Sequence, residues 1–152
     1  MEYDLLLANA EVRGLRVYEE KMPPRIKGLY ADDTIWINRD QTTIAKACAI
    51  IEEIAHHQLT VGDILDQTDI RNRKQELRAR QWAYECMLPL DRIVQAYYAC
   101  VSGRYDLADF LGVTEEFLQA SIDRYTEKHG KSVRADEEHI VLFEPLGVIK
   151  IF

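Results

Sequence analysis

The stretch Ile51-Glu52-Glu53-Ile54-Ala55-His56-His57 decides how the chain is interpreted. It closes a segment in which apolar residues recur at helical spacing, and this pattern predicts a helix over residues 44–57 with one buried face. Glu52 and His56 are four positions apart, so their side chains are expected to meet on one face of that helix. Glu53 is expected beside that face, about 100° further round the helix.

The spacing is close to H-E-x-x-H, a helical signature in which two histidines bind zinc and the glutamate between them acts as a general base. Glu53 and His56 are retained here, and Glu52 stands in place of the first histidine. A carboxylate binds Zn²⁺ at nearly the same distance as an imidazole, but a second carboxylate makes the site harder and less selective for zinc. The alternative interpretation is a solvated Glu-Glu face followed by a histidine pair that favours the C-terminal end of the helix.

A third ligand is expected from a second helix, predicted over residues 73–87. Glu76, Ala79 and Ala83 form a stripe along one face of that helix. The two alanines would let another helix approach closely, so Glu76 is expected to point into a helix–helix interface instead of solvent. The candidate metal ligands are therefore Glu52, His56 and Glu76.

The rest of the chain alternates between short strands and helices, which predicts an α+β fold. Before the helix at 44–57, the pattern predicts a helix over 3–11, a strand over 15–18, and a hairpin of strands over 25–30 and 34–38. After residue 89, it predicts helices over 91–101, 105–111 and 114–128, and two strands within 138–152.

The composition limits the classes of protein that fit. The chain has 152 residues, a formal net charge of −7, and an ordinary balance of 47% hydrophobic and 30% charged residues. An acidic chain of this kind is a poor general nucleic-acid binder. Its cysteines have no CxxC spacing and are interpreted as buried, reduced thiols. The sequence begins with acidic residues and has no long apolar run, so we expect a cytoplasmic protein without a signal peptide or membrane span.

Several segments resemble, in the right order, the ImmA/IrrE family of metallo-endopeptidases, especially the short members carried by phages and integrative elements. The segments are Lys27-Gly28-Leu29-Tyr30 with Ile35-Trp36-Ile37-Asn38, the metal motif at 51–57, the block 76–83 followed by Met87-Leu88-Pro89, residues 107–118, and Phe143-Glu144-Pro145. Together they span nearly the whole chain.

The resemblance implies a gluzincin-like fold with a small N-terminal sheet, an active-site helix, a C-terminal helical region and a terminal hairpin. It implies one zinc ion, held by Glu52, His56 and Glu76, with Glu53 as the catalytic base. The domains would then be a metallopeptidase-like core over 1–89, a helical region resembling a helix-turn-helix over 90–130, and a β-hairpin tail over 131–152 packed on the same domain.

The function implied is that of a zinc-dependent endopeptidase of the anti-repressor type, which cleaves the helix-turn-helix repressor of a phage or mobile element. The alternative is a catalytically weak or inactive module of the same fold that binds a regulator without cutting it. Glu52 is the residue on which the choice between the two depends.

Residues 106–118 also resemble a helix-turn-helix, with Gly112 at the turn. The second helix carries more acidic than basic side chains, and a negative helix repels phosphate. We therefore expect no direct nucleic-acid binding, and expect bundle packing or docking of a partner protein instead.

Three further expectations concern single side chains and one cluster. The basic residues between 71 and 80 are expected to form a solvated face, with docking of an acidic substrate segment as the alternative. Tyr97 and Tyr98 are expected in the core. His139 is expected at the surface.

Overall fold

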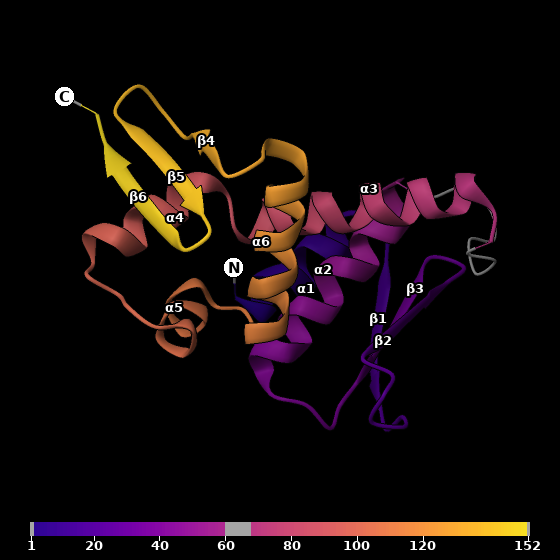
Figure 1. The fold of residues 1–152 in the computed structure, drawn as a ribbon. Helices are drawn as coiled ribbons and strands as arrows, with labels where there is room; N and C mark the ends of the chain where they lie inside the picture. The colour runs from indigo at the N-terminus through magenta and orange to yellow at the C-terminus, as the bar shows by residue number, and fades with distance from the viewer. Residues whose placement is uncertain (1, 60–67, 152) are drawn as a thin grey trace. The chain divides into compact units, whose positions relative to one another are not determined.

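The computed structural model describes residues 2–59 and 68–151, and it confirms the α+β class (Figure 1). The chain divides into two compact units, Met1–Ala83 and Tyr84–Phe152. Among the described residues, no helix is both long enough and apolar enough to span a membrane.

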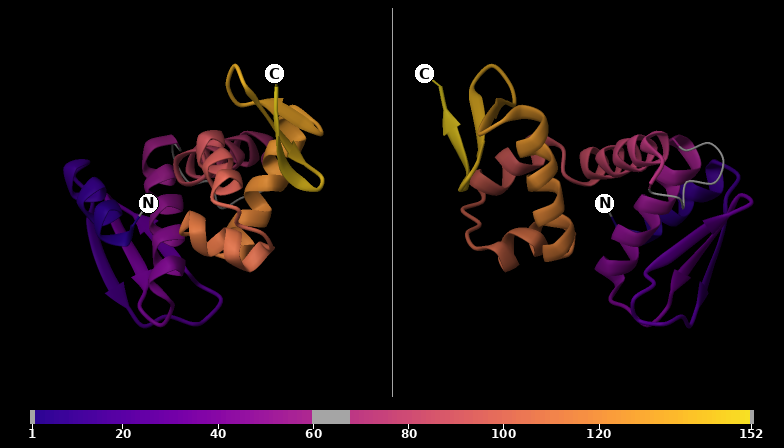
Figure 2. Two further views of the ribbon diagram at one scale, coloured as in Figure 1. Left: turned by 90° about the vertical axis from the view of Figure 1, so that its left-hand side faces the viewer. Right: turned by 45° about the vertical axis from the view of Figure 1, so that its right-hand side comes forward.

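The first unit combines a three-stranded sheet with three helical segments. Its elements are α1 (Tyr3–Val12), β1 (Arg16–Glu20), β2 (Gly28–Ala31), β3 (Thr34–Asn38), α2 (Thr43–Leu59) and the first part of α3 (Ile70–Met87). The strand order is β1-β3-β2, with β1 parallel and β2 antiparallel to β3. Figure 2 shows α2 lying along one face of this sheet.

The hairpin of β2 and β3 forms where the sequence predicts it. Asp32 and Asp33 make the turn with φ of 50° and 58°, left-handed values that aspartate tolerates better than most residues. Ile35 and Ile37 of β3 are completely buried on one face of the sheet. At the end of β3, the side-chain nitrogen of Asn38 donates hydrogen bonds to the backbone carbonyl oxygens of residues 22, 23 and 26, which precede β2. This arrangement leaves β2 at an edge of the described sheet.

Helices α2 and α3 bury the small and branched side chains that their helical periodicity predicts to face the core. Ile54 and Ala55 of α2 have no exposed surface. Ala79 and Ala83 of α3 are also completely buried, as expected from the alanine stripe. The stripe therefore sets the orientation of Glu76, which lies one turn before Ala79 and is largely buried.

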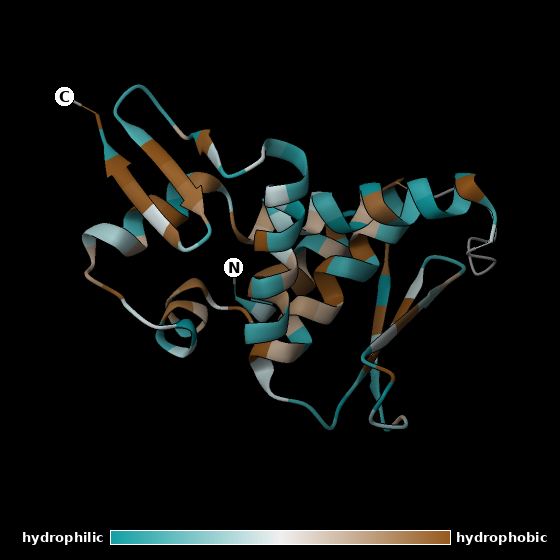
Figure 3. Ribbon diagram, in the orientation of Figure 1, coloured by the Kyte–Doolittle hydropathy of each residue, from teal (hydrophilic) through white to brown (hydrophobic). Residues whose placement is uncertain are grey.

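The second unit packs helices against a small antiparallel sheet. Its elements begin with the end of α3 and continue with α4 (Leu90–Tyr98), α5 (Arg104–Leu111), α6 (Glu115–His129), β4 (Ser132–Arg134), β5 (His139–Phe143) and β6 (Leu146–Lys150). The strand order is β4-β5-β6, and Figure 3 shows β5 and β6 as predominantly apolar. The core joins residues of α4, α6, β5 and β6, namely Ile93, Val94, Tyr125, Val141, Phe143 and Val148.

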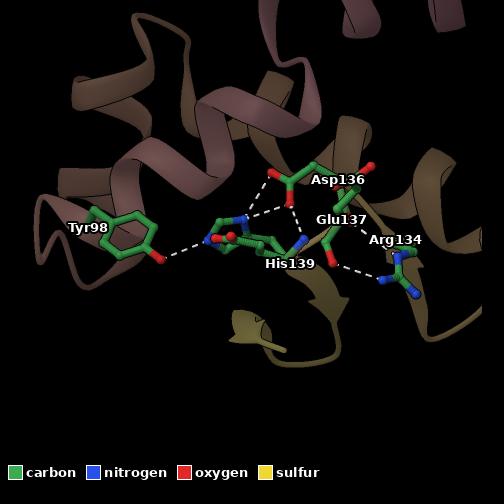
Figure 4. A network of polar contacts seen from close by, with 6 residues as sticks. Tyr98, Arg134, Asp136, Glu137 and His139 are labelled. Atoms are coloured by element: carbon green, nitrogen blue, oxygen red, sulfur yellow. Dashed lines mark hydrogen bonds and ion pairs between the residues drawn. The ribbon is translucent and has the colours of Figure 1, made fainter. Parts of the chain in front are cut away.

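A polar network in this unit overturns two expectations about burial (Figure 4). Tyr97 and Tyr98, expected in the core, are 50% and 54% exposed because they lie at the end of α4, beyond its buried face. His139, expected at the surface, is only 9% exposed. Its Nδ1 lies 2.8 and 2.9 Å from the two Asp136 carboxylate oxygens, and its Nε2 lies 2.7 Å from the Tyr98 hydroxyl. These bonds connect α4 with the start of β5 and satisfy the buried ring.

The cysteines agree only partly with the expectation of buried thiols. None of the three forms a disulfide, but only Cys48 is buried, whereas Cys86 is partly exposed and Cys100 is exposed. Cys100 follows the end of α4 with φ of 58°, which places it in a surface turn.

The pair α5–α6 keeps the helix-turn-helix outline but carries the wrong charge for DNA. Gly112 makes the turn with φ of 72°, and Thr114 caps α6 by accepting a hydrogen bond from the Phe117 amide. Glu115 and Glu116 lie exposed in the first turn of α6, the part of a recognition helix that would face base edges.

We therefore predict that the protein forms no sequence-specific complex with DNA, because these carboxylates would repel phosphate. Fluorescence anisotropy with duplex DNA from the region around the gene, recorded at low salt, should show no saturable binding. Tight binding that weakens steeply with added salt would contradict the charge argument.

Candidate functional site

Glu53 lies against the edge strand β2 at its only glycine. A Cβ atom built on Gly28 would lie 3.3 Å from Glu53 Cγ and 3.3 Å from the Trp36 carbonyl oxygen. Both separations are shorter than ordinary van der Waals contact, so a larger residue at position 28 would displace the Glu53 side chain. Gly28 thus lets helix α2 bring Glu53 close to the edge of the sheet.

One turn further along α2, His57 makes a second contact with the same strand. The Tyr30 hydroxyl lies 2.8 Å from His57 Nδ1, and Asp33 Oδ1 lies 3.4 Å from each of these two atoms. Glu53 and His57 are four positions apart on α2, while Gly28 and Tyr30 are two apart on β2. The same helical face therefore meets the same strand face at two successive points.

His56 faces away from that strand, toward α3. Its Nε2 lies 3.0 Å from Glu76 Oε2, and its Nδ1 lies 3.7 Å from Glu53 Oε2. The other oxygen of Glu76, Oε1, accepts a 2.7 Å hydrogen bond from Arg80 Nε, one turn further along α3. The two oxygens of Glu76 thus have different partners, one on each helix.

Burial controls the charge of the two glutamates on α2. The Glu53 side chain is only 13% exposed, and loss of hydration raises its pKa to about 7. The pKa of Glu52 is also raised, mainly by burial, while the charges of Arg80 and His56 oppose the increase. Glu53 is consequently a carboxyl group that can gain and lose a proton near neutral pH, as a general base must.

The pair of His56 and Glu76 has pKa values shifted in opposite directions. Their hydrogen bond is the largest cause in both residues, raising the pKa of His56 and lowering that of Glu76 to about 2. Both shifts favour the charged forms of the pair. Arg80 contributes further to the low pKa of Glu76.

The donors in this cluster fit a divalent ion by chemical type, although they do not converge on one point. An imidazole nitrogen and carboxylate oxygens are zinc ligands, and the 3.0 Å between His56 Nε2 and Glu76 Oε2 is near the ~3.3 Å between two ligands of tetrahedral zinc. Within residues 2–59 and 68–151, however, no group of three or more His, Cys, Asp or Glu side chains is arranged to hold a metal. Of the three predicted ligands, the structure brings His56 and Glu76 together, and Glu52 would have to join them to complete the set.

A substitution of Glu52 tests whether this position is a ligand. Glu52→His recreates the two-histidine spacing on α2, so we expect zinc to bind about tenfold more tightly than in the wild type, since imidazole suits zinc better than a carboxylate. Competition with a chromogenic chelator would measure the dissociation constants. The control is Glu20→His, at an exposed position of β1, which should leave the affinity unchanged. Equal affinity in wild type and Glu52→His would remove Glu52 from the ligand set.

Sequence reasoning missed three features of this site. Three residues that contact residues of the site were not assigned to it: Gly28, Tyr30 and Arg80. Only the contact of Arg80 could have been predicted from the sequence, because its four-residue spacing from Glu76 places the two side chains on one helical face. The contacts of Gly28 and Tyr30 depend on how α2 lies on the sheet, which no local pattern reports.

Comparison with known families gives one match. The profile of the family Peptidase M78, described as the IrrE N-terminal-like domain, matches residues 10–123 and so includes every residue of this site. No curated protein and no solved structure matches the chain significantly.

Proposed function

The chain belongs to the Peptidase M78 family of IrrE N-terminal-like domains, and on this premise we propose that it is a zinc-dependent endopeptidase with a gluzincin-like fold. The observation that carries the proposal is the position of Glu53: a buried carboxyl group with a pKa of about 7, close to His56 on one side and to the edge strand β2 on the other.

The edge strand offers a way to hold a peptide. Because β2 pairs only with β3 in the described sheet, an extended segment of a substrate can add to its open side through main-chain hydrogen bonds. The absence of a side chain at Gly28 places Glu53 next to that segment. Tyr30 and His57 would meet the same segment about two residues away.

Glu53 would carry the proton in the reaction. Ionised Glu53 accepts a proton from a water molecule as the water oxygen attacks the peptide carbonyl carbon. The carbon–nitrogen bond then breaks, and protonated Glu53 returns the proton to the leaving amine. A divalent ion held by Glu52, His56 and Glu76 would supply Lewis-acid polarisation of the carbonyl and the water.

For the substrate we propose a helix-turn-helix transcriptional repressor of a phage or mobile element. This part rests on the resemblance of the chain to the short, phage-carried members of the family. Co-expression with a repressor encoded beside the gene, followed by gel analysis of the repressor, tests it. Appearance of two fragments that sum to the intact repressor supports the proposal, and an intact repressor in the presence of relieved repression counts against it.

A second candidate is a binding module that inactivates a regulator without cleavage. Two observations favour it: Glu52 in place of a histidine, and the direct pairing of His56 with Glu76 and of Glu76 with Arg80. In that case the repressor would be released from its operator intact, and Glu53 would not matter for the release.

A further inference from the structure

The hydrogen-bonded chain of Asp136, His139 and Tyr98 has the connectivity of a carboxylate that orients a base and a base that activates a hydroxyl (Figure 4). The Asp136 oxygens lie 2.8 and 2.9 Å from His139 Nδ1, and the Tyr98 hydroxyl lies 2.7 Å from the other ring nitrogen, Nε2. All three residues belong to the second unit, whereas Glu53 and its neighbours on α2 belong to the first. The proposed peptidase chemistry therefore does not use them.

The carboxylate of Asp136 determines which nitrogen of His139 carries the proton. The Glu138 backbone N–H donates a 2.7 Å hydrogen bond to Asp136 Oδ1. Backbone hydrogen bonding from Glu138 and the contact with His139 lower the pKa of Asp136, so at neutral pH this group is ionised and only accepts hydrogen bonds. In neutral His139 the proton is therefore on Nδ1, and Nε2 accepts a hydrogen bond from the Tyr98 hydroxyl.

The turn between β4 and β5 holds the carboxylate and the imidazole in place. Arg134 donates from Nε to the Asp136 backbone carbonyl oxygen at 3.2 Å, and from Nη2 to that of Glu137 at 2.8 Å. The Ala135 amide donates a 2.9 Å hydrogen bond to the His139 carbonyl oxygen and closes the turn. These bonds preorganise the base toward the Tyr98 hydroxyl, as an activating group requires.

The hydroxyl and its base differ in their exposure to solvent. Tyr98 is 54% exposed and His139 is 9% exposed, so a reagent from solvent can approach the tyrosine while the imidazole is shielded. The preceding residue, Tyr97, provides an internal comparison, because it is 50% exposed and packs edge-on against the Tyr98 ring. Among the contacts of the described residues, the Tyr97 hydroxyl meets no imidazole. The two tyrosines thus differ mainly in the base.

We propose that Tyr98 is an activated nucleophile that accepts an acyl group from an activated ester, with His139 as its general base and Asp136 as the positioning residue. The Tyr98 oxygen bonds to the carbonyl carbon of the ester while its proton passes to His139 Nε2. The carbon–oxygen bond to the leaving group then breaks, and the imidazolium returns the proton to the departing oxygen. The products are O-acylated Tyr98 and a free alcohol, and His139 ends neutral.

Acetylation of the full-length protein by p-nitrophenyl acetate tests the proposal. The reaction would be run at about pH 8, where an ordinary imidazole is neutral, and stopped at intervals. Peptide mass spectrometry would then give the rate of acetylation at each tyrosine. We expect Tyr98 to react about tenfold faster than Tyr97, because only Tyr98 has a base. An equal rate at the two residues, or a slower rate at Tyr98, would overturn the proposal.

Substitutions distinguish activation from a merely structural bridge. His139→Gln removes the base and should lower the Tyr98 rate to that of Tyr97, whereas a structural bridge predicts a faster rate, because its loss frees the hydroxyl. Asp136→Asn should slow Tyr98 several-fold, and Asp136→Glu, which keeps the charge, should restore part of the rate. The control is Asp109→Asn, the same change at an exposed position of α5, which should have no effect.

The outcome does not depend on one variant. An unchanged or increased Tyr98 rate in His139→Gln refutes the role of the base, and an unchanged rate in Asp136→Asn refutes the role of the carboxylate. If His139→Gln does not fold, the ratio of the Tyr98 and Tyr97 rates in the wild type and in Asp136→Asn decides the proposal, because Tyr97 reports the general reactivity of an exposed tyrosine in the same molecule.

Discussion

Glu53→Gln is expected to leave a folded chain that binds its protein target but does not cleave it. Glutamine keeps the shape of the side chain against Gly28 and removes the proton acceptor. A general base typically contributes ~10²–10⁴-fold to rate, so cleavage should fall by that factor. The measurement is the rate at which purified protein cuts the repressor, with zinc supplied, for wild type and variant side by side.

The matched control for this experiment is Glu116→Gln, which makes the same chemical change at an exposed position of α6. It should cleave at the wild-type rate. If wild type and Glu53→Gln both leave the repressor intact and both relieve repression, the protein acts by binding. Loss of cleavage in both variants would point to a general effect of glutamine substitution and not to Glu53.

The metal-free protein is expected to lose stability as the pH rises from about 5 to about 8. The folded-state pKa of Glu53, about 7, lies above the ~4.3 of an unfolded glutamate, so the folded chain binds more protons through this window. The raised pKa of His56 acts in the same direction, because its stabilisation is lost as the pH rises through the folded value. Glu76, with a lowered pKa, loses its stabilising effect only at acid pH, below about 4.5.

The size of the pKa shift of Glu53 sets how much free energy of unfolding is lost as the pH rises. A full shift of this kind corresponds to roughly 3 kcal/mol, and residual solvent contact of the side chain reduces the expected loss to about 2 kcal/mol. Urea unfolding with a chelator at about pH 5.5 and about pH 8 would measure it. Glu53→Gln should be more stable than wild type at the higher pH and should show a smaller pH dependence. An identical pH dependence in both proteins would mean that Glu53 is not the buried acid.

Much of the fold could be predicted from the sequence because local patterns reported it directly. The hairpin of β2 and β3 depends on the Asp32-Asp33 turn between two apolar runs, and both α2 and α3 follow a periodic buried stripe. Strand β4 was missed because three residues are too few to show alternation; it exists through its pairing with β5. The burial of His139 was missed because its Nε2 partner, Tyr98, lies on α4, far away in the sequence, although Asp136 is only three residues before it.

The candidate site was predictable only in part. Spacing alone placed Glu52, Glu53 and His56 on adjacent faces of one helix, and the alanine stripe turned Glu76 inward. That His56 and Glu76 meet at 3.0 Å depends on the register of two helices. The closeness of Glu53 to Gly28 depends on how a helix lies on a strand edge, and a single sequence carries no local signal for that contact.

The central claim, that this cluster is a metallopeptidase centre, is tested most directly by metal content. Purified wild type and His56→Ala would be dialysed to equilibrium against micromolar zinc, and bound metal would be measured per chain. The account predicts one zinc ion per wild-type chain and loss of that ion in His56→Ala, because His56 supplies the only imidazole among the predicted ligands. No bound zinc in the wild type, or equal zinc in both proteins, would contradict it.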